Sequence, residues 1–84
     1  MPCTTELVEE LNTLLRFDLA TSQQGIKIHK DADPTIIAAV HRLHAKGLIT
    51  QNDGGYLTSL GRDAAEHAQA LLSILTTTPA RQPA

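Results

Sequence analysis

Aromatic residues and cysteine are scarce in this sequence. Its 84 residues include one Phe, one Tyr and no Trp. With so few aromatic rings and many Ala and Leu residues, closely packed helices are favoured over a large β-sandwich. The single Cys3 excludes an internal disulfide, and its position near one end makes it a poor candidate nucleophile. One unpaired cysteine suits a reducing compartment, so we expect a cytoplasmic protein.

Long hydrophobic runs and a strong net charge are also missing. No segment approaches the apolar length of a membrane span, and no basic-then-apolar leader opens the chain, so we expect no membrane partner. The formal net charge is -2, but the charges are unevenly spread. Residues 1–18 hold four acidic side chains and one Arg, whereas residues 19–58 hold four basic and three acidic ones. The middle of the chain is therefore its mildly basic part.

A β-hairpin is predicted in the second half of the chain. Leu48–Thr50 and Tyr56–Thr58 are short runs of β-favouring residues, and Gln51–Gly55 connects them. The Asn, Asp and Gly residues of this connection tolerate the positive φ angles that tight hairpin turns require. The two runs are therefore expected to pair as neighbouring strands.

Capping signals flank the hairpin. Gly47 stands where a glycine is expected at the end of a helix, and either Thr58 or Ser59 is placed to cap the next helix with its hydroxyl group. Gly61 falls within the first turn of that next helix, where it lowers stability relative to Ala. We therefore expect Gly61 to let the helix pass close to another backbone.

Apolar residues at helical spacing predict three helices. The first covers about residues 5–16, and the last runs from about Leu60 to Leu75. The middle helix begins after Asp33, which caps it, with Pro34 in its first position. Its expected buried face consists of Ile36, Ile37, Val40 and Leu43.

Residues 19–33 carry two conflicting signals. Thr21-Ser22-Gln23-Gln24 resembles a capping box and predicts a short helix that continues through Ile26 to about Lys30. Residues 25–29, in contrast, alternate with a period of two, as a strand does. We favour the helix, because with a turn at residues 31–33 it completes a helix-turn-helix.

Two motifs resemble the winged-helix DNA-binding superfamily of bacterial regulators. Its recognition helix ends in Arg-Leu-x-x-Lys-Gly-Leu-Ile, matched by residues 42–49, and its wing returns through Tyr-Leu-Thr-x-x-Gly, matched by residues 56–61. The whole chain also resembles a small, functionally uncharacterised proteobacterial family described as DNA-binding. The resemblance implies a mainly α fold with a small β-hairpin wing (α+β), a winged helix-turn-helix, as one domain over residues 1–75. The Thr- and Pro-containing tail, residues 76–84, is expected to be disordered.

If the resemblance holds for function, double-stranded DNA is the partner and the middle helix enters the major groove. A helical wheel places one set of its residues opposite the buried face: Thr35, Ala38, Ala39, Arg42 and Lys46. Arg42 is suited to bidentate guanine recognition, and Thr35 to a base edge or a thymine methyl group. Lys46 supports them at the groove, and Lys27 and Lys30 are expected to hold phosphates.

The same residues also allow a second reading. The two alanines carry little recognition chemistry, the first helix is acidic, and the hairpin connection has no cation. These features favour a winged-helix protein-interaction module that does not bind DNA. We lean towards a DNA-binding transcription regulator, with the interaction module as the alternative.

Terminal helices with strong apolar stripes indicate a homodimer. By analogy with winged-helix regulators that pair through terminal helices, the expected interface residues are Leu7, Leu14, Leu71 and Leu75. The opposing interpretation is that these leucines pack together within one chain.

Catalytic, cofactor and metal sites are not expected. His41 and His44 stand three residues apart on the middle helix, with His29 earlier in the chain, but no Cys or carboxylate completes a recognisable ligand spacing. Gly54-Gly55 lacks the following Lys of a phosphate-binding loop. If the three histidines came together they would form a pH sensor, although nothing in the sequence requires this.

Overall fold

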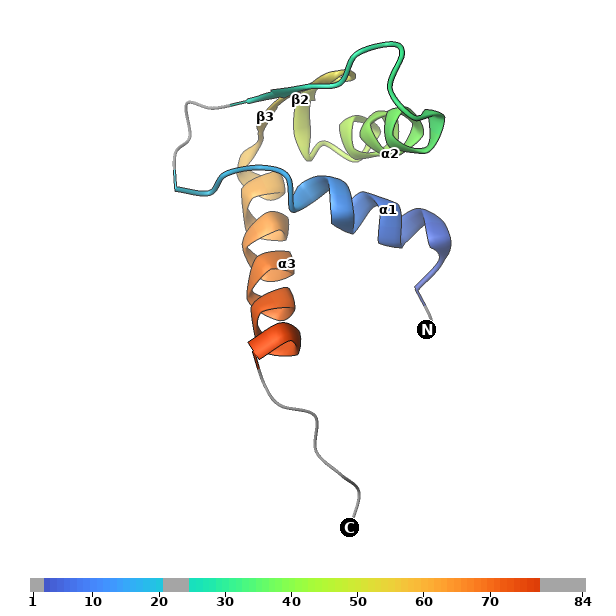
Figure 1. Cartoon of the computed structure of the whole chain (residues 1–84). Coiled ribbons are helices and arrows are strands. Elements are labelled where there is room, and N and C mark those ends of the chain that lie inside the picture. Colours follow the sequence, from blue (N-terminus) through green and yellow to red (C-terminus); the bar gives the residue numbers. More distant parts are fainter. Residues whose placement is uncertain (1–2, 21–24, 78–84) are drawn as a thin grey trace.

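Three helices and a three-stranded antiparallel sheet make up the computed structural model, which describes residues 3–20 and 25–77 (Figure 1). The elements follow one another as α1 (Thr5–Leu14), β1 (Ile26–Lys27), α2 (Pro34–Ala45), β2 (Ile49–Gln51), β3 (Gly54–Leu57) and α3 (Ser59–Thr77). The fold is therefore α+β, as the sequence predicts.

The sheet has the strand order β1-β3-β2. The hairpin of β2 and β3 is confirmed, with Ile49 opposite Leu57, and β1 adds a third strand on the other side of β3. In β1, Ile26 lies opposite Gly55 and Lys27 opposite Gly54. A Cβ atom added at Gly54 would overlap the backbone carbonyl of Ile26, so glycine at this position allows β1 to approach β3.

The helix predicted through Ile26 to Lys30 is wrong, because this segment starts as strand β1. Ile26 and Ile28 are half-buried whereas Lys27 and His29 are exposed, which is the period-two pattern of a strand. The backbone N–H of Ile28 donates a 2.8 Å hydrogen bond to the carbonyl of Asp53, so the pairing extends beyond β1. The capping box at residues 21–24 lies outside the described residues. Within the described residues, no helix lies between α1 and α2.

The helix ends follow the local signals closely. The Asp33 carboxylate accepts a 2.9 Å hydrogen bond from the backbone N–H of Thr35, which confirms the predicted cap of α2. At the start of α3, Thr58 Oγ1 accepts a 3.0 Å bond from the N–H of Gly61, so Thr58 is the capping residue. Helix α3 continues to Thr77, two residues into the segment predicted as a tail.

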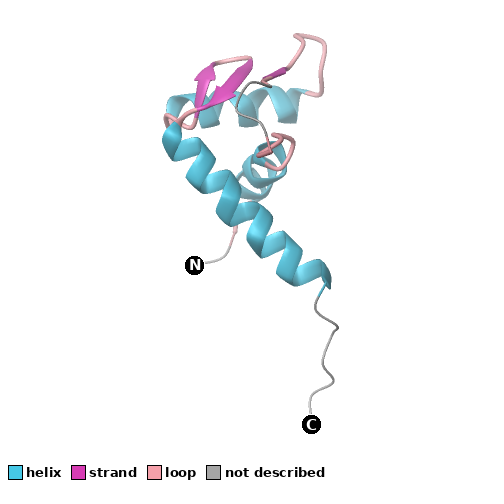
Figure 2. Ribbon diagram, turned by 90° about the vertical axis from the view of Figure 1, so that its left-hand side faces the viewer, coloured by secondary structure: helices cyan, strands magenta, loops and turns pink. Residues whose placement is uncertain are grey.

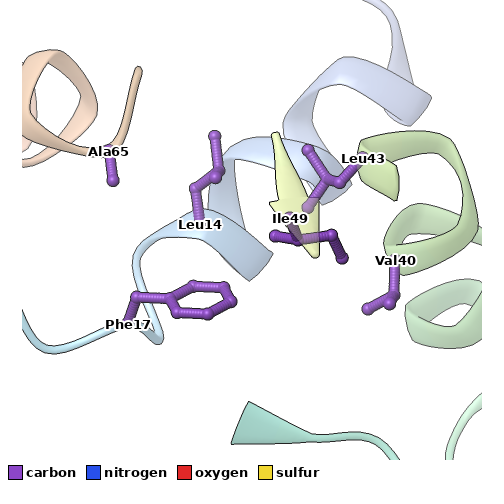
Figure 3. Close-up of a cluster of buried hydrophobic side chains, with 6 residues drawn as sticks. All are labelled: Leu14, Phe17, Val40, Leu43, Ile49 and Ala65. Atoms are coloured by element: carbon purple, nitrogen blue, oxygen red, sulfur yellow. The ribbon is translucent and has the colours of Figure 1, made fainter. Parts of the chain in front are cut away.

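The core lies where α1, α2, β2 and α3 meet (Figure 3). Its buried apolar side chains are Leu14, Phe17, Val40, Leu43, Ile49 and Ala65. Val40 and Leu43 confirm the predicted inner face of α2. The predicted position of Ala39 on the open face of α2 is wrong, because Ala39 is 0% exposed. Helix α1 packs against α2, so more of the surface of α2 is covered than the helical-wheel pattern predicts.

Candidate functional site

Arg42 of α2 and Lys46, which caps the C-terminal end of that helix, were expected at DNA but instead contact α1. Arg42 Nε donates a 2.7 Å hydrogen bond to Oε2 of Glu10, and Lys46 Nζ donates to Oε1 of the same carboxylate. Arg42 Nη2 also donates a 3.3 Å bond to the carbonyl of Glu6 and lies 3.6 Å from Oε1 of Glu9. The acidic side chains of α1 thus bind the positively charged side chains at the C-terminal end of α2.

The charge of Glu10 is stabilised although its side chain is buried. Burial acts to raise the pKa of Glu10, but hydrogen bonds from Lys46 and Arg42, together with their positive charges, outweigh burial and lower that pKa. The hydrogen bond to Glu10 in turn raises the pKa of Arg42. These three side chains form a satisfied ion cluster whose evident role is to fix α1 against α2.

A groove of about 500 Å³ opens on another side of α2. It is bounded by β1 and the segment that follows it, by the side of α2 that carries Ile37, Val40 and His41, and by the turn between β2 and β3. Its lining residues are Lys27, Ile28, His29, Lys30, Ile37, Val40, His41, Asn52 and Asp53. The floor is therefore apolar, whereas the rim carries two lysines and two histidines against one carboxylate.

The segment leading into α2 holds the two rim lysines. The alternation that buries Ile28 leaves Lys27 exposed, and a turn then follows in which the N–H of Ala32 donates a 3.0 Å bond to the carbonyl of His29. Lys30 is exposed within this turn. The structure thus brings the two predicted phosphate-binding residues to one groove.

The remaining predicted recognition residues lie at the start of α2. Thr35 and Ala38 are exposed. The hydroxyl of Thr35 is already engaged, because it donates a 2.8 Å hydrogen bond to Oδ1 of Asp33. His41 follows Ala38 by one helical turn and is also exposed, on the rim of the groove.

His41 is the side chain that the sequence reading missed. Its spacing of three residues from Ala38 was the available signal, but the wheel assigned it to the boundary of the buried face. His29 lines the same groove as His41. Across the described parts of the chain, no group of three or more His, Cys, Asp or Glu residues is placed to hold a metal ion.

The four leucines expected at a dimer interface have different environments. Leu14 is a core residue with 5% exposure, so its side chain is not available for pairing. Leu7 is half-buried, and Leu71 and Leu75 are exposed by 53% and 68%. Of these four predicted interface leucines, Leu71 and Leu75 on α3 are exposed and remain open to a partner. No helix within residues 3–20 and 25–77 is long and apolar enough to cross a membrane.

One protein-family model matches most of the chain. The model of a family described as a "Family of unknown function (DUF5669)" matches residues 1–76. The chain belongs to this family. No curated protein and no solved structure matches the chain. The description of the family assigns no activity, so the site has to be interpreted from its own geometry.

Proposed function

We propose that this chain is a small DNA-binding protein of the winged-helix type that acts as a transcription regulator. One observation carries the proposal: Lys27, Lys30 and His41 border the same groove as Asn52 of the hairpin turn. Cations beside an exposed helix and a hairpin turn are the parts that anchor a winged helix on a duplex. The strand order β1-β3-β2 with α2 preceding the hairpin is compatible with this fold.

The proposal assigns the DNA contacts to partly different residues from those expected from the sequence. Lys27 and Lys30 contact phosphates, and the exposed residues Thr35, Ala38 and His41 face base edges. Arg42 and Lys46 hold α2 in place through Glu10, so their contribution to DNA binding is indirect. Asp53 at the groove offsets part of the positive charge, so we expect micromolar affinity and not nanomolar affinity.

Fluorescence anisotropy with mixed genomic DNA fragments, at low and then physiological salt, tests the proposal. We expect binding that weakens with salt, since each neutralised phosphate contributes about 0.9 to the slope of log K against log salt. Lys27→Ala and Lys30→Ala should each reduce that slope by about 1. Arg16→Ala is the matched control, because Arg16 is an exposed cation that does not line the groove. No binding at low salt would overturn the proposal.

One observation favours the interaction module as a second candidate. The cluster around Glu10 removes two cations from the face of α2, and the exposed Ala38 leaves part of that face small and uncharged. Such a surface suits a protein partner better than a phosphate backbone. Two results together would favour this candidate. The protein would show no DNA binding, and it would bind a protein partner whose binding is lost with Ala38→Glu but retained with Lys27→Ala and Lys30→Ala.

A further inference from the structure

One side of α3 carries a stripe along most of its length that is exposed except at Ala64 and apolar except at His67. Its five positions alternate in spacing between four and three residues: Leu60, Ala64, His67, Leu71 and Ile74. Leu60, Leu71 and Ile74 are exposed by 58%, 53% and 60%. We call these five residues the α3 stripe.

Apart from Ala64, which is half-buried and packs against the core, the α3 stripe lies beside the face of α3 that packs on the domain. The buried residues of α3 are Gly61, Ala65 and Ala68, which point to the body of the protein from a neighbouring face. Leu14 and Phe17 belong to the same buried cluster as Ala65. The apolar surface of α3 is therefore wider than the domain itself can cover.

The C-terminal half of α3 also projects beyond the rest of the fold. Figures 1 and 2 both show it extending away from α1, α2 and the sheet. Residues 68–77 contain no charged side chain, and residues 70–77 are all exposed. A helix of this length has marginal stability in water unless an apolar face is packed. Packing of an apolar face would therefore stabilise the projecting turns.

We propose that the α3 stripe packs against the same stripe of a second copy of this chain. Alternating spacings of four and three residues are those of a coiled-coil seam, which indicates a helix as the partner. The seam holds no carboxylate or ammonium group that would oppose its own copy.

The available area is consistent with a pair. With Leu75 beside it, the stripe offers on the order of 500 Å² from each protomer, hence about 1,000 Å² in all, which is near the lower limit for a specific interface. A two-fold pair presents identical patches to each other, so no second surface is needed. The inference does not rest on DNA binding, and its test uses no DNA.

Sedimentation equilibrium of the full chain over a range of concentrations tests the proposal. We expect a monomer–dimer equilibrium. Ile74→Glu places a charge in the seam and should give monomers, whereas Ser73→Glu places the same charge on the opposite side of α3 and should leave the dimer intact. His67→Leu completes the apolar seam and should lower the dimer Kd about tenfold, because a polar seam residue costs stability.

Circular dichroism on the same samples separates loss of pairing from loss of folding. If Ile74→Glu unfolds, His67→Glu serves in its place, since His67 is exposed and lies at the middle of the seam. A wild-type chain that stays monomeric at all concentrations would overturn the proposal. So would a dimer that responds equally to Ile74→Glu and Ser73→Glu.

Discussion

Arg42 Nε donates a 2.7 Å hydrogen bond to Oε2 of Glu10, which joins two residues 32 positions apart in the chain. Glu10 is 5% exposed, so its negative charge requires a partner inside the fold. Arg42 and Lys46 supply that partner from one side of α2. The contact therefore decides which side of α2 lies on α1 and which side remains open to a ligand.

Replacement of Glu10 should be more costly than replacement of its neighbour. Glu10→Gln removes the charge that compensates Arg42 and Lys46, and we expect it to lower the free energy of unfolding by about 1–2 kcal/mol. Glu9→Gln is the control, because Glu9 lies 3.6 Å from Arg42 with its side chain 30% exposed, and it should cost less than about 0.5 kcal/mol. Urea unfolding measures both, and equal losses would contradict the assigned role of Glu10.

The ion cluster also predicts an acid sensitivity. Because the pKa of Glu10 is lowered from 4.5 in the folded state, its contribution is present above about pH 4.5 and is lost as the pH falls through the folded value. Hydrogen bonds from Thr35 also lower the pKa of Asp33, and the acid sensitivity that Asp33 contributes is still present in Glu10→Gln. Stability measured from pH 7 to pH 3 should therefore fall more steeply for the wild type than for Glu10→Gln. Parallel curves would refute the linkage.

Signals that act within a few residues could be read from the sequence. Asp33 and Pro34 fix the start of α2 through a cap and a preset φ angle, both local effects. The hairpin follows from turn residues between two β-favouring runs. Each of these features depends on chain neighbours alone, and the structure confirms them.

Strand β1 depends on a distant partner, and this is why its prediction failed. The alternation at Ile26 and Ile28 was visible, but a capping-box signal just before it favoured a helix. The deciding fact lies at residue 54, where a glycine lets the backbone of Ile26 approach β3 closely. That relationship is invisible until the hairpin is placed beside β1.

The orientation of α2 could not be predicted for a similar reason. The wheel correctly separates a polar side with Arg42 from an apolar side with Leu43, yet polar residues can face either solvent or a buried carboxylate. Ala39 among the polar residues was a hint that another helix covers them. The matching signal, Glu10, lies too far away in the sequence to be linked to Arg42 by spacing.

Gly61 provides a sharp test of the contact between α3 and the hairpin. A Cβ atom added at Gly61 would overlap the backbone carbonyl of Leu48, and backbone atoms cannot easily move aside. Gly61→Ala should therefore destabilise the protein by about 3 kcal/mol, even though Ala is the better helix former. Ala70→Gly on the exposed side of α3 is the control, with an expected loss of about 1 kcal/mol. Thermal unfolding of the two variants tests this, and a stabilising Gly61→Ala would contradict the contact.

Thr58 links the end of α2 to the start of α3 through one hydroxyl group. Its Oγ1 donates a 2.6 Å hydrogen bond to the carbonyl of Gly47 and accepts a 3.0 Å bond from the N–H of Gly61. Thr58→Val keeps the shape but loses both bonds, so we expect a loss of about 2 kcal/mol in the free energy of unfolding. Thr58→Ser retains the hydroxyl and should lose less than half of that.

Ser59→Ala separates this role from a general preference for hydroxyl groups at a helix start. Ser59 is exposed and was the other candidate cap, so its replacement should change stability by less than about 0.5 kcal/mol. Urea denaturation of the three variants at pH 7 gives the comparison. If Ser59→Ala were as damaging as Thr58→Val, the cap would be shared, and the hydroxyl of Thr58 would not be the group that sets the start of α3 against Gly47.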